Sequence, residues 1–398
     1  MKDKTKDLLD ALIAQIKDGD ELNLIADRLK KKGIESLLKG EMTVHLGHEQ
    51  GSEPVGSNIR NGFSEKTIKN QSGEQRIKIP RDREGTFEPV TVPKHKSISQ
   101  ELADCIILLY AKGMSNSDII DFMKHTYGVS YSTSQVSIIT DSLLEDIFEW
   151  QQRPLEDQYA VVWIDAIHYK IRQDGKVISK AVMLVLGIDM SGKQDILSMS
   201  IVQTESASGW TGILDDLKSR GVKDILILCS DNLKGIDKAI QATFPDSIQQ
   251  ICIVHQIRNS LKFVSYKDRK AIVKDIKAIY QSSNEEMARQ HFETFKQNWN
   301  GKYPISVKSW EDNWERLTAF LAYPQEVRKL IYTTNIIESF NASLRKFTKN
   351  KKVFPTDQAA TKSVYLAIMQ ISKKWKKTRY GWGTIYNQLY IYFENRIY

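Results

Sequence analysis

The chain has 398 residues, 41% of them apolar, so it is long enough to bury a core and to divide into two or three domains. No run approaches the roughly 18 apolar residues of a membrane helix, and the charges throughout residues 1–31 exclude a signal peptide. Cys105, Cys229 and Cys252 are too few and too scattered for a disulfide framework or a four-thiolate zinc site. We therefore expect a cytoplasmic globular protein with no membrane partner.

Positive charge is concentrated at the C-terminal end. The whole chain carries a formal net charge of +8, whereas residues 340–398 hold twelve Lys and Arg against Asp357 and Glu394, a net charge of 12 − 2 = +10. The preceding residues then carry 8 − 10 = −2. A basic surplus at one end is typical of a surface that holds a polyanion. An ordinary solvated face is the alternative.

The first 96 residues change character at about residue 46. Apolar side chains at three- and four-residue spacings predict short amphipathic helices in residues 2–46; they include Leu8, Leu9, Leu12, Ile13 and Ile16. In residues 47–96, Gly, Ser, Asn and Pro separate short extended pieces such as RIKIP and EPVTV. This second stretch is expected to be a loop-rich β module or a linker.

Residues 97–150 return to a helical pattern. ELADCIILLYAKG and SNSDIIDFMKHTYG predict two short helices, and SYSTSQVSIITDSLLEDIFEW predicts a third helix that begins at Ser or Thr. This order fits a helix-turn-helix whose last helix enters a DNA major groove. A three-helix bundle that reads no DNA gives the same pattern. QRP near residue 152 then indicates a domain boundary.

Residues 151–255 read as the first part of an α/β core. YAVVWID, AVMLVLGIDM and DILSMSIV predict three strands separated by glycine-bearing turns, hence antiparallel neighbours. A helix-like segment, GWTGILDDLKSRG, then leads to DILILCSD and IQQICIVH, which predicts a crossover to parallel pairing. This order of strands is that of a ribonuclease-H-like mixed sheet.

The remaining residues divide into three predicted parts. Residues 256–333 are expected to be an all-α insertion in the core, anchored by Trp299, Trp310, Trp314 and Phe320. Residues 334–370 would complete the core with one more functional helix. Residues 371–398, which include KKWKKTRYGW, are expected to be a basic, aromatic tail.

Two aspartates follow apolar strands. Asp165 comes at the end of VVWID and Asp231 at the end of ILILCSD, so both are expected at the carboxyl edge of the sheet, where functional sites form. Each alone is as readily a turn former or a helix cap. Their occurrence together favours a shared site.

Glu338 is the third candidate acid. In TTNIIESFNASLRKFTKN it shares a polar helix face with Asn341 and Arg345, opposite an apolar stripe, and can point over the sheet edge. The alternative is a capping box, in which Asn335 begins the helix and Glu338 stands three residues on. Three carboxylates together offer hard oxygen ligands for two Mg²⁺ or Mn²⁺ ions about 4 Å apart.

Other metal and cofactor signals are weak. Cys252 and His255 have a metal-like spacing in CIVHQIRN, but there is no second pair nearby, so zinc is not expected. His255 is instead a candidate for contacting DNA or the groups around the acids. GIDMSGK lacks the glycine spacing of a phosphate-binding loop or a dinucleotide fingerprint. We therefore expect no organic cofactor and no dependence on ATP.

Several blocks in order resemble the Mutator-type transposases of bacterial insertion sequences, which use three metal-binding acids. DAIHYKIRQDGKVISKAVMLVLGID resembles the block with that family's first aspartate, here Asp165. TESASGWTGILDDLKSRG followed by SDNLKGIDKAIQATFP is similar to the block with the second, here Asp231. CIVHQIRN matches the family's Cys-or-Asp, two residues, His element. SWEDNWERLTAFLAYPQEVRKLIYTTNIIESFNASLRKFTK resembles the block that ends in the catalytic glutamate, here Glu338.

The resemblance covers residues 3–396 and implies a function. It implies a ribonuclease-H-like core interrupted by a helical insertion, an N-terminal region that binds DNA, and metal-dependent cleavage and strand transfer at the terminal inverted repeats of an insertion sequence. Reaction at two ends calls for a homodimer or a higher homo-oligomer on DNA. The alternatives are a DNA-binding regulator that retains the fold without transposing, and a nuclease of the same fold that cuts without joining.

The resemblance also suggests DNA contacts. By analogy with related transposases, Trp310 or Trp314 would stack on a distorted base, the alternative being that both are packing anchors. Cations beyond the catalytic helix would neutralise phosphates, or else form an exposed helix face. The candidate contacts, with the two tryptophans, are His255, Arg258, Arg345, Lys346, Lys349, Lys373, Lys374, Lys376 and Lys377.

Overall fold

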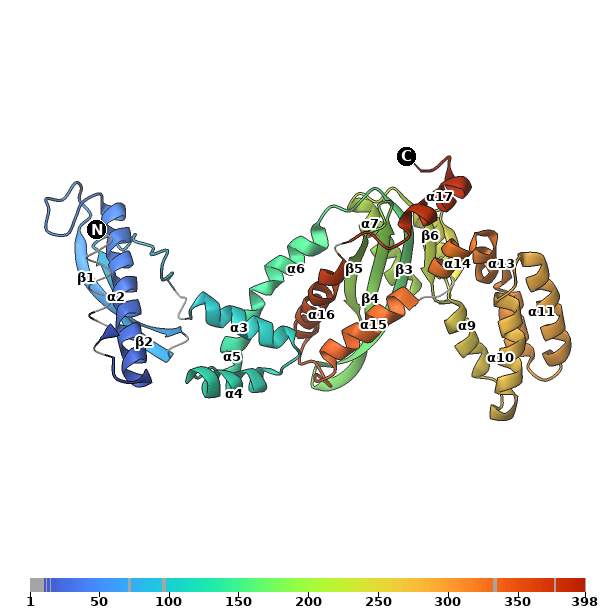
Figure 1. Cartoon of the computed structure of the whole chain (residues 1–398), viewed down its shortest axis with the longest axis horizontal. Coiled ribbons are helices and arrows are strands. Elements are labelled where there is room, and N and C mark those ends of the chain that lie inside the picture. The colour runs from blue at the N-terminus through green and yellow to red at the C-terminus, as the bar shows by residue number, and fades with distance from the viewer. Residues whose placement is uncertain are drawn as a thin grey trace. The chain divides into compact units, whose positions relative to one another are not determined.

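A computed structural model describes residues 11, 13, 14, 16–70, 73–94, 98–331, 335–375 and 377–397. The chain divides into two compact units, Met1–Asp141 and Ser142–Tyr398 (Figure 1). No helix in the described parts is long and apolar enough to cross a membrane.

Residues 19–46 of the first unit form one long helix, whereas several short helices were predicted in residues 2–46. Helix α2 (Gly19–Leu46) starts at Asp18, whose side chain accepts hydrogen bonds from the backbone N–H groups of Asp20 and Glu21, and ends at Gly47 with a left-handed φ of 72°. The segment contains no proline, so nothing in it forces a break. The predicted apolar positions Leu8, Leu9 and Leu12 lie outside the described residues.

The predicted β module is a two-stranded hairpin. Strand β1 (Arg60–Asn70) pairs antiparallel with β2 (Gly73–Asp82), which contains RIKIP, whereas EPVTV forms no strand. Leu38 of α2 packs with Ile77 and Val92 in the small core of this hairpin. The helix and the hairpin therefore stabilise each other, because a two-stranded hairpin alone is marginal in water.

Three short helices complete the first unit: α3 (Gln100–Ala111), α4 (Asn116–Tyr127) and α5 (Thr133–Asp141). Ser115 and Asp118 form a capping box at the start of α4, and Gly128, with a φ of 65°, ends it. Ile106 and Met123 lie fully buried among these helices. The last predicted helix is divided, since α5 stops at Asp141 and α6 (Leu143–Gln152) belongs to the second unit.

The second unit contains a five-stranded mixed sheet. The strands are β3 (Gln158–Gln173), β4 (Lys176–Asp189), β5 (Gln194–Val202), β6 (Asp224–Ser230) and β7 (Ile248–Ile251). Their order is β5-β4-β3-β6-β7, with β3, β4 and β5 antiparallel and β3, β6 and β7 parallel. The predicted change from antiparallel to parallel pairing is confirmed.

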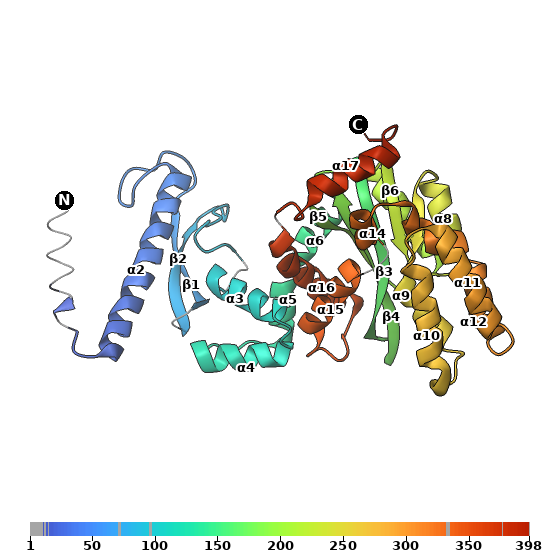
Figure 2. The same cartoon turned by 45° about the vertical axis from the view of Figure 1, so that its right-hand side comes forward.

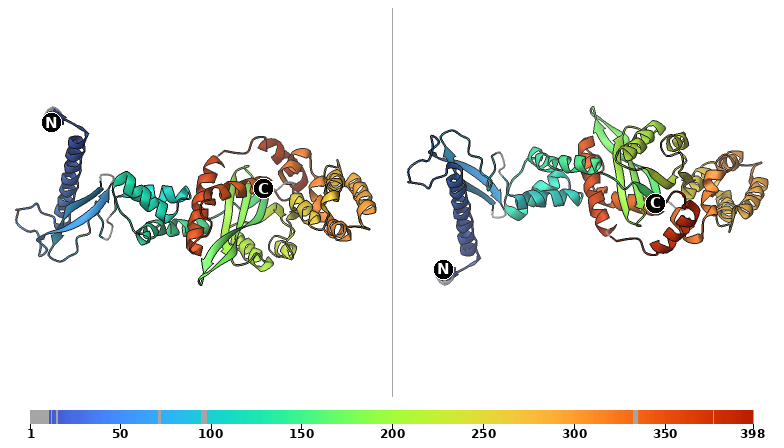
Figure 3. Two further views of the ribbon diagram at one scale, coloured as in Figure 1. Left: turned by 90° about the horizontal axis from the view of Figure 1, so that it is seen from below. Right: turned by 90° about the horizontal axis from the view of Figure 1, so that it is seen from above.

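Helices cover both faces of this sheet (Figure 3). Val162 and Met183 face a core that is completed by α7 (Ala207–Ser219) and α8 (Ile236–Thr243). Trp163 and Leu184, the next residue on each strand, face the opposite and larger core. Because both faces are covered, the central strands are apolar along most of their length rather than alternating.

The segment after β7 is helical, as predicted, and begins slightly earlier than expected. It consists of α9 (Ile253–Leu261), α10 (Tyr266–Tyr280), α11 (Glu285–Trp299), α12 (Pro304–Glu311), α13 (Trp314–Thr318), the 3₁₀ helix η1 (Ala319–Ala322) and α14 (Gln325–Ile331). Figure 2 shows α9 to α12 grouped beside the parallel edge of the sheet. Their apolar side chains join the larger core.

The C-terminal part packs on the sheet face that carries the larger core. It contains α15 (Asn335–Thr348), α16 (Asp357–Ser372), the 3₁₀ helix η2 (Lys373–Trp375) and α17 (Trp382–Phe393). Trp382, Leu389 and Phe393 belong to the larger core, so much of the segment predicted as a tail is packed structure. Lys362 is also buried, so not all of the basic surplus is solvated.

Candidate active site

Asp165 and Asp231 lie at matching positions on two adjacent parallel strands. Trp163 of β3 is paired with Cys229 of β6, and each aspartate comes two residues later. Strand β6 ends at Ser230, so Asp231 follows its carboxyl end. The prediction that Asp165 ends its strand is wrong, because β3 continues to Gln173 alongside the antiparallel β4. It lies where its parallel neighbour stops, which still gives the two acids a common sheet edge.

Asp165 is held by hydrogen bonds on both carboxylate oxygens. The backbone N–H of Ala166 donates to Oδ1 at 2.8 Å, and Nδ2 of Asn341, a buried side chain of α15, donates to Oδ2 at 2.6 Å. Burial, and then the negative charge of Asp231, raise the pKa of Asp165 to about 7. The carboxylate is thus fixed in position while its charge is poorly compensated by the protein.

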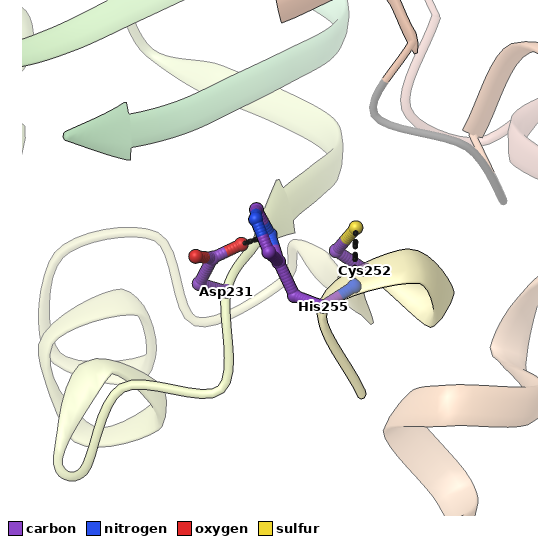
Figure 4. Close-up of side chains that lie close together, drawn as sticks. All are labelled: Asp231, Cys252 and His255. Atoms are coloured by element: carbon purple, nitrogen blue, oxygen red, sulfur yellow. Dashed lines mark hydrogen bonds and ion pairs between the residues drawn. The ribbon is translucent and has the colours of Figure 1, made fainter. Parts of the chain in front are cut away.

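Asp231 is in contact with His255 at the start of α9 (Figure 4). Nδ1 of His255 pairs with Oδ1 of Asp231, and this hydrogen bond is the main cause that raises the pKa of His255 to about 10. Cys252 precedes α9, and its Sγ accepts the backbone N–H of His255 at 3.4 Å. Potential ligand atoms of Asp231, Cys252 and His255 all lie within 4.8 Å of one another. The sequence showed the Cys–His spacing but not that Asp231 joins the pair.

Glu338 reaches the same histidine from another helix. Its Oε1 lies 3.9 Å from Nε2 of His255 and 3.3 Å from a guanidinium nitrogen of Arg258, and its side chain is 26% exposed. One imidazole ring therefore lies between Glu338 and Asp231. The alternative that Asn335 and Glu338 form a capping box depends on the Asn335 side chain, which lies outside the described residues.

These acids fit a divalent cation. Asp165, Asp231 and Glu338 carry carboxylate oxygens, the ligands that Mg²⁺ and Mn²⁺ prefer. In the described residues, however, the potential ligand atoms that lie within 4.8 Å of one another are those of Asp231, Cys252 and His255. Burial is the main cause that raises the pKa of Asp165, and the nearby Asp231 carboxylate adds to it; a bound cation would offset both effects. Asn341 and the backbone N–H of Ala166 orient the Asp165 carboxylate, and because both donors are neutral they do not compete with a cation for its negative charge.

Trp310 and Trp314 lie in the interior of the helical segment. Trp310 is fully buried and donates its Nε1–H to Oγ of Ser260 at 3.0 Å, whereas Trp314 is 4% exposed and donates to Glu285 at 3.1 Å. A buried indole with a satisfied N–H is a packing anchor, and neither ring presents an open face to a base. The geometry therefore favours the packing alternative for both residues.

The predicted cationic contacts are mostly at the surface. Arg345, Lys346 and Lys349 are exposed on and just after α15, and Lys373, Lys374 and Lys377 are exposed around η2. Lys376 lies outside the described residues. Arg258 is 60% exposed and pairs with Glu338, so it is the candidate contact nearest the acids, together with His255.

Comparison with known proteins identifies the family. The profile of the family described as "Transposase, Mutator family" matches residues 2–378. The probable transposase for insertion sequence element ISRM3-like of Sinorhizobium fredii and the transposase for insertion sequence element ISRM3 of Rhizobium meliloti are 41% and 40% identical over 397 residues, which is 99% of each chain. The solved Drosophila P element transposase strand transfer complex is 10% identical, covering 70% of this chain and 92% of that one, with a TM-score of 0.35. The assignment depends on the sequence relatives: the chain belongs to the Mutator family of transposases.

Proposed function

We propose that this transposase binds the terminal inverted repeats of an insertion sequence and catalyses metal-dependent DNA cleavage and strand transfer. One observation carries the proposal: Asp165 and Asp231 lie in register on adjacent parallel strands, and Glu338 approaches them from α15 through His255. Two hydrogen bonds orient the Asp165 carboxylate, as a cation site requires of its ligands.

The proposed architecture is a ribonuclease-H-like core. Its support is the strand order β5-β4-β3-β6-β7, with three antiparallel strands followed by two parallel ones. In this interpretation the helices from α9 to α14 form an insertion before the catalytic helix α15. The long separation between Asp231 and Glu338, 338 − 231 = 107 residues, accommodates them.

The residues divide the work of a phosphodiester exchange. Divalent ions held by Asp165, Asp231 and Glu338 would activate a water or a 3′-hydroxyl and stabilise the leaving oxygen. Asn341 holds the Asp165 carboxylate in one orientation, and His255 holds that of Asp231. Arg258 is placed to neutralise a phosphate beside Glu338. In the proposed reaction, water attack frees a 3′-hydroxyl at the element end, and that hydroxyl then attacks the target phosphodiester.

DNA contacts are proposed for both units. In the first unit, α5 is the candidate recognition helix, because Ser134, Gln135 and Ile138 are exposed on it. In the second unit, Arg345, Lys349, Lys373 and Lys377 are exposed cations for the DNA backbone. Acting on two element ends calls for at least two copies of the chain.

The direct test is cleavage and joining of a labelled DNA end that carries the element's inverted repeat. Wild type is compared with Asp231→Asn and Glu338→Gln in Mg²⁺, and Glu286→Gln, an exposed acid on α11, is the matched control. Wild type and the control are expected to give nicked and joined products, whereas the two site variants bind the DNA but do not cut it.

Other results select the alternatives. Equal cutting by all four proteins would remove these acids from the chemistry. Binding of repeat DNA with no cutting by wild type would favour a regulator that retains the fold. Cutting with persistent absence of joined product would favour a nuclease.

A further inference from the structure

A groove lies beside the proposed active site, along a second face of the catalytic helix. It has a volume of about 520 Å³ and lies between α15, α16 and η2. Ser339, Ser343 and Lys346 of α15 line it, whereas Glu338 and Asn341 of the same helix face the acids. One helix therefore carries both surfaces, and Figure 1 shows α15 and α16 next to each other.

The chemistry of the groove suits a nucleic acid strand. Lys346 and Lys374 line it, and none of the described residues that line it is an aspartate or a glutamate. Both lysines are exposed, and within the described part of the chain neither has an ion-pair partner. Ser339, Ser343 and Gln370 add hydrogen-bonding groups. The groove thus offers uncompensated positive charge and neutral polar groups, which together favour a phosphate-bearing ligand.

Aromatic rings distinguish this groove from a surface that contacts only a DNA backbone. Phe347 and Trp375 line it and are half-buried, and the buried Phe340 lies behind Trp375 with its ring 5.6 Å from the indole. Duplex DNA keeps the faces of its bases stacked inside, so an aromatic wall has nothing to stack on except an unpaired base. The combination of cations with aromatic rings is the one that proteins use for single strands.

From these observations we propose that the groove binds an unpaired DNA nucleotide a few nucleotides from the reacting phosphodiester, with its base against Trp375 and its phosphates between Lys346 and Lys374. The proposal rests on DNA being the substrate, as stated above. Lys346 follows Glu338 by eight residues, which is about 12 Å along a helix. A few nucleotides span that distance, so a DNA strand bound at the acids can extend along α15 into the groove.

The first experiment measures DNA binding without metal, so that no reaction occurs. Affinities of the full chain for a short single strand and for a blunt duplex of the same sequence are compared by fluorescence anisotropy in EDTA. Trp375→Leu, which keeps an apolar side chain without a ring, is expected to weaken single-strand binding about 10-fold, with duplex binding little changed. Trp375→Phe is expected to retain most of the affinity.

The lysines are tested with a charge-matched control. Lys346→Glu with Lys374→Glu is expected to weaken single-strand binding more strongly than Lys270→Glu with Lys274→Glu, two exposed positions on α10. Loss of single-strand and duplex binding by the same factor in the Trp375 and lysine variants would overturn the proposal, since the surface would then hold only the backbone. Unchanged single-strand affinity in Trp375→Leu would overturn it as well.

A second measurement uses wild-type protein and so does not depend on how the variants fold. A single strand that carries 5-iododeoxyuridine is crosslinked by light, and the attached peptide is identified by mass spectrometry. A crosslink at Trp375 or Phe347 is expected, and crosslinks confined to residues outside the groove would overturn the proposal. Neither measurement requires DNA cutting. A protein that crosslinks in the groove but never cuts DNA would contradict the proposed function and leave the groove proposal standing. A protein that cuts DNA but does not crosslink in the groove would contradict only the groove proposal.

Discussion

Asn341 of α15 donates a 2.6 Å hydrogen bond to Asp165 of β3, so two residues 176 positions apart fix the geometry of one carboxylate. Glu338 is one turn earlier on the same helix. Any shift of α15 therefore moves Glu338 and the donor to Asp165 together. The bond couples α15 to the sheet edge at Asp165.

Replacing Asn341 by alanine is expected to lower metal-dependent cleavage about 10- to 100-fold, the range found when groups that orient metal ligands are removed. A higher Mg²⁺ concentration for half-maximal rate should accompany the loss, because Asp165 is no longer held in one orientation. Cleavage rates over a Mg²⁺ titration measure both effects. A slower rate with an unchanged Mg²⁺ requirement would show that Asn341 acts on the fold alone.

Divalent metal is expected to stabilise the folded protein. A ligand that binds only the native state at 100 times its Kd adds about 2.7 kcal/mol to the free energy of unfolding. Thermal unfolding of wild type should therefore shift upward with Mg²⁺ or Mn²⁺, and the shift should be lost in Asp165→Asn and kept in Glu286→Gln. The same upward shift in all three proteins would place the bound ion elsewhere.

Lys351 is expected to make the free energy of unfolding depend on pH. Burial, and then the charge of Lys362, lower the pKa of Lys351 to about 7 from its ordinary value of 10.5. The folded state therefore binds this proton more weakly than the unfolded chain, and the resulting destabilisation is absent above pH 10.5, grows as the pH falls and is complete below about pH 7. Lys351→Met is expected to raise the free energy of unfolding by about 1 to 2 kcal/mol near pH 7.

That gain should shrink toward about pH 10 in denaturant unfolding curves. Loss of the 2.8 Å hydrogen bond from Lys351 to Ser363 offsets part of it, and Lys352→Met at the exposed neighbouring position is the control. A gain that does not vary with pH would mean that Lys351 carries no proton-linked penalty.

Substitutions at Trp310 test whether this side chain is a packing anchor or stacks on a DNA base. Trp310→Ala is expected to cost about 3 to 5 kcal/mol of stability, because it removes a large, fully buried side chain. Trp310→Phe should cost less and leave repeat binding and cleavage near wild type. Chemical unfolding and a cleavage assay check the two variants. A folded Trp310→Phe protein that fails only in its reaction with DNA would restore the stacking interpretation.

The exposed cations around η2 are expected to set the salt dependence of DNA binding. Each phosphate contact that is lost should lower the slope of log K against log salt by about 0.9. Lys373→Gln with Lys377→Gln should therefore flatten the slope by about 2, whereas Lys270→Gln with Lys274→Gln on α10 should leave it unchanged. Equal slopes in all proteins would make the η2 lysines an ordinary solvated face.

The order of elements could be predicted from the sequence, because it depends on local patterns. Apolar runs separated by Gly-bearing turns predicted the antiparallel strands, and an intervening helical pattern predicted the parallel crossover. The end of β3 was misplaced at Asp165, since strand length is set by the partner β4 and not by the apolar run. The length of α2 was also predicted wrongly, because its many polar residues obscure the apolar spacing that indicates one continuous helix.

The contacts within the site were harder to predict. Residue type and position indicated Asp165, Asp231 and Glu338 as candidate acids. No local pattern indicates that His255 lies between Asp231 and Glu338, or that Asn341 donates to Asp165. Asn341 stood on the expected polar stripe of α15, which was the available signal. Side-chain pairs of this kind depend on packing between distant segments, and one sequence alone does not contain that information.

The 176-residue separation of Asp165 and Asn341 also has a consequence for protein synthesis. At about 5 to 20 residues per second, α15 leaves the ribosome roughly 10 to 35 s after β3. For the first 231 − 165 = 66 residues of that interval the chain has only Asp165, and afterwards it has Asp165 and Asp231 but neither Glu338 nor the amide that orients Asp165. Under the proposed function, the ability to break DNA arises only after the sheet and the helices beside it have been made.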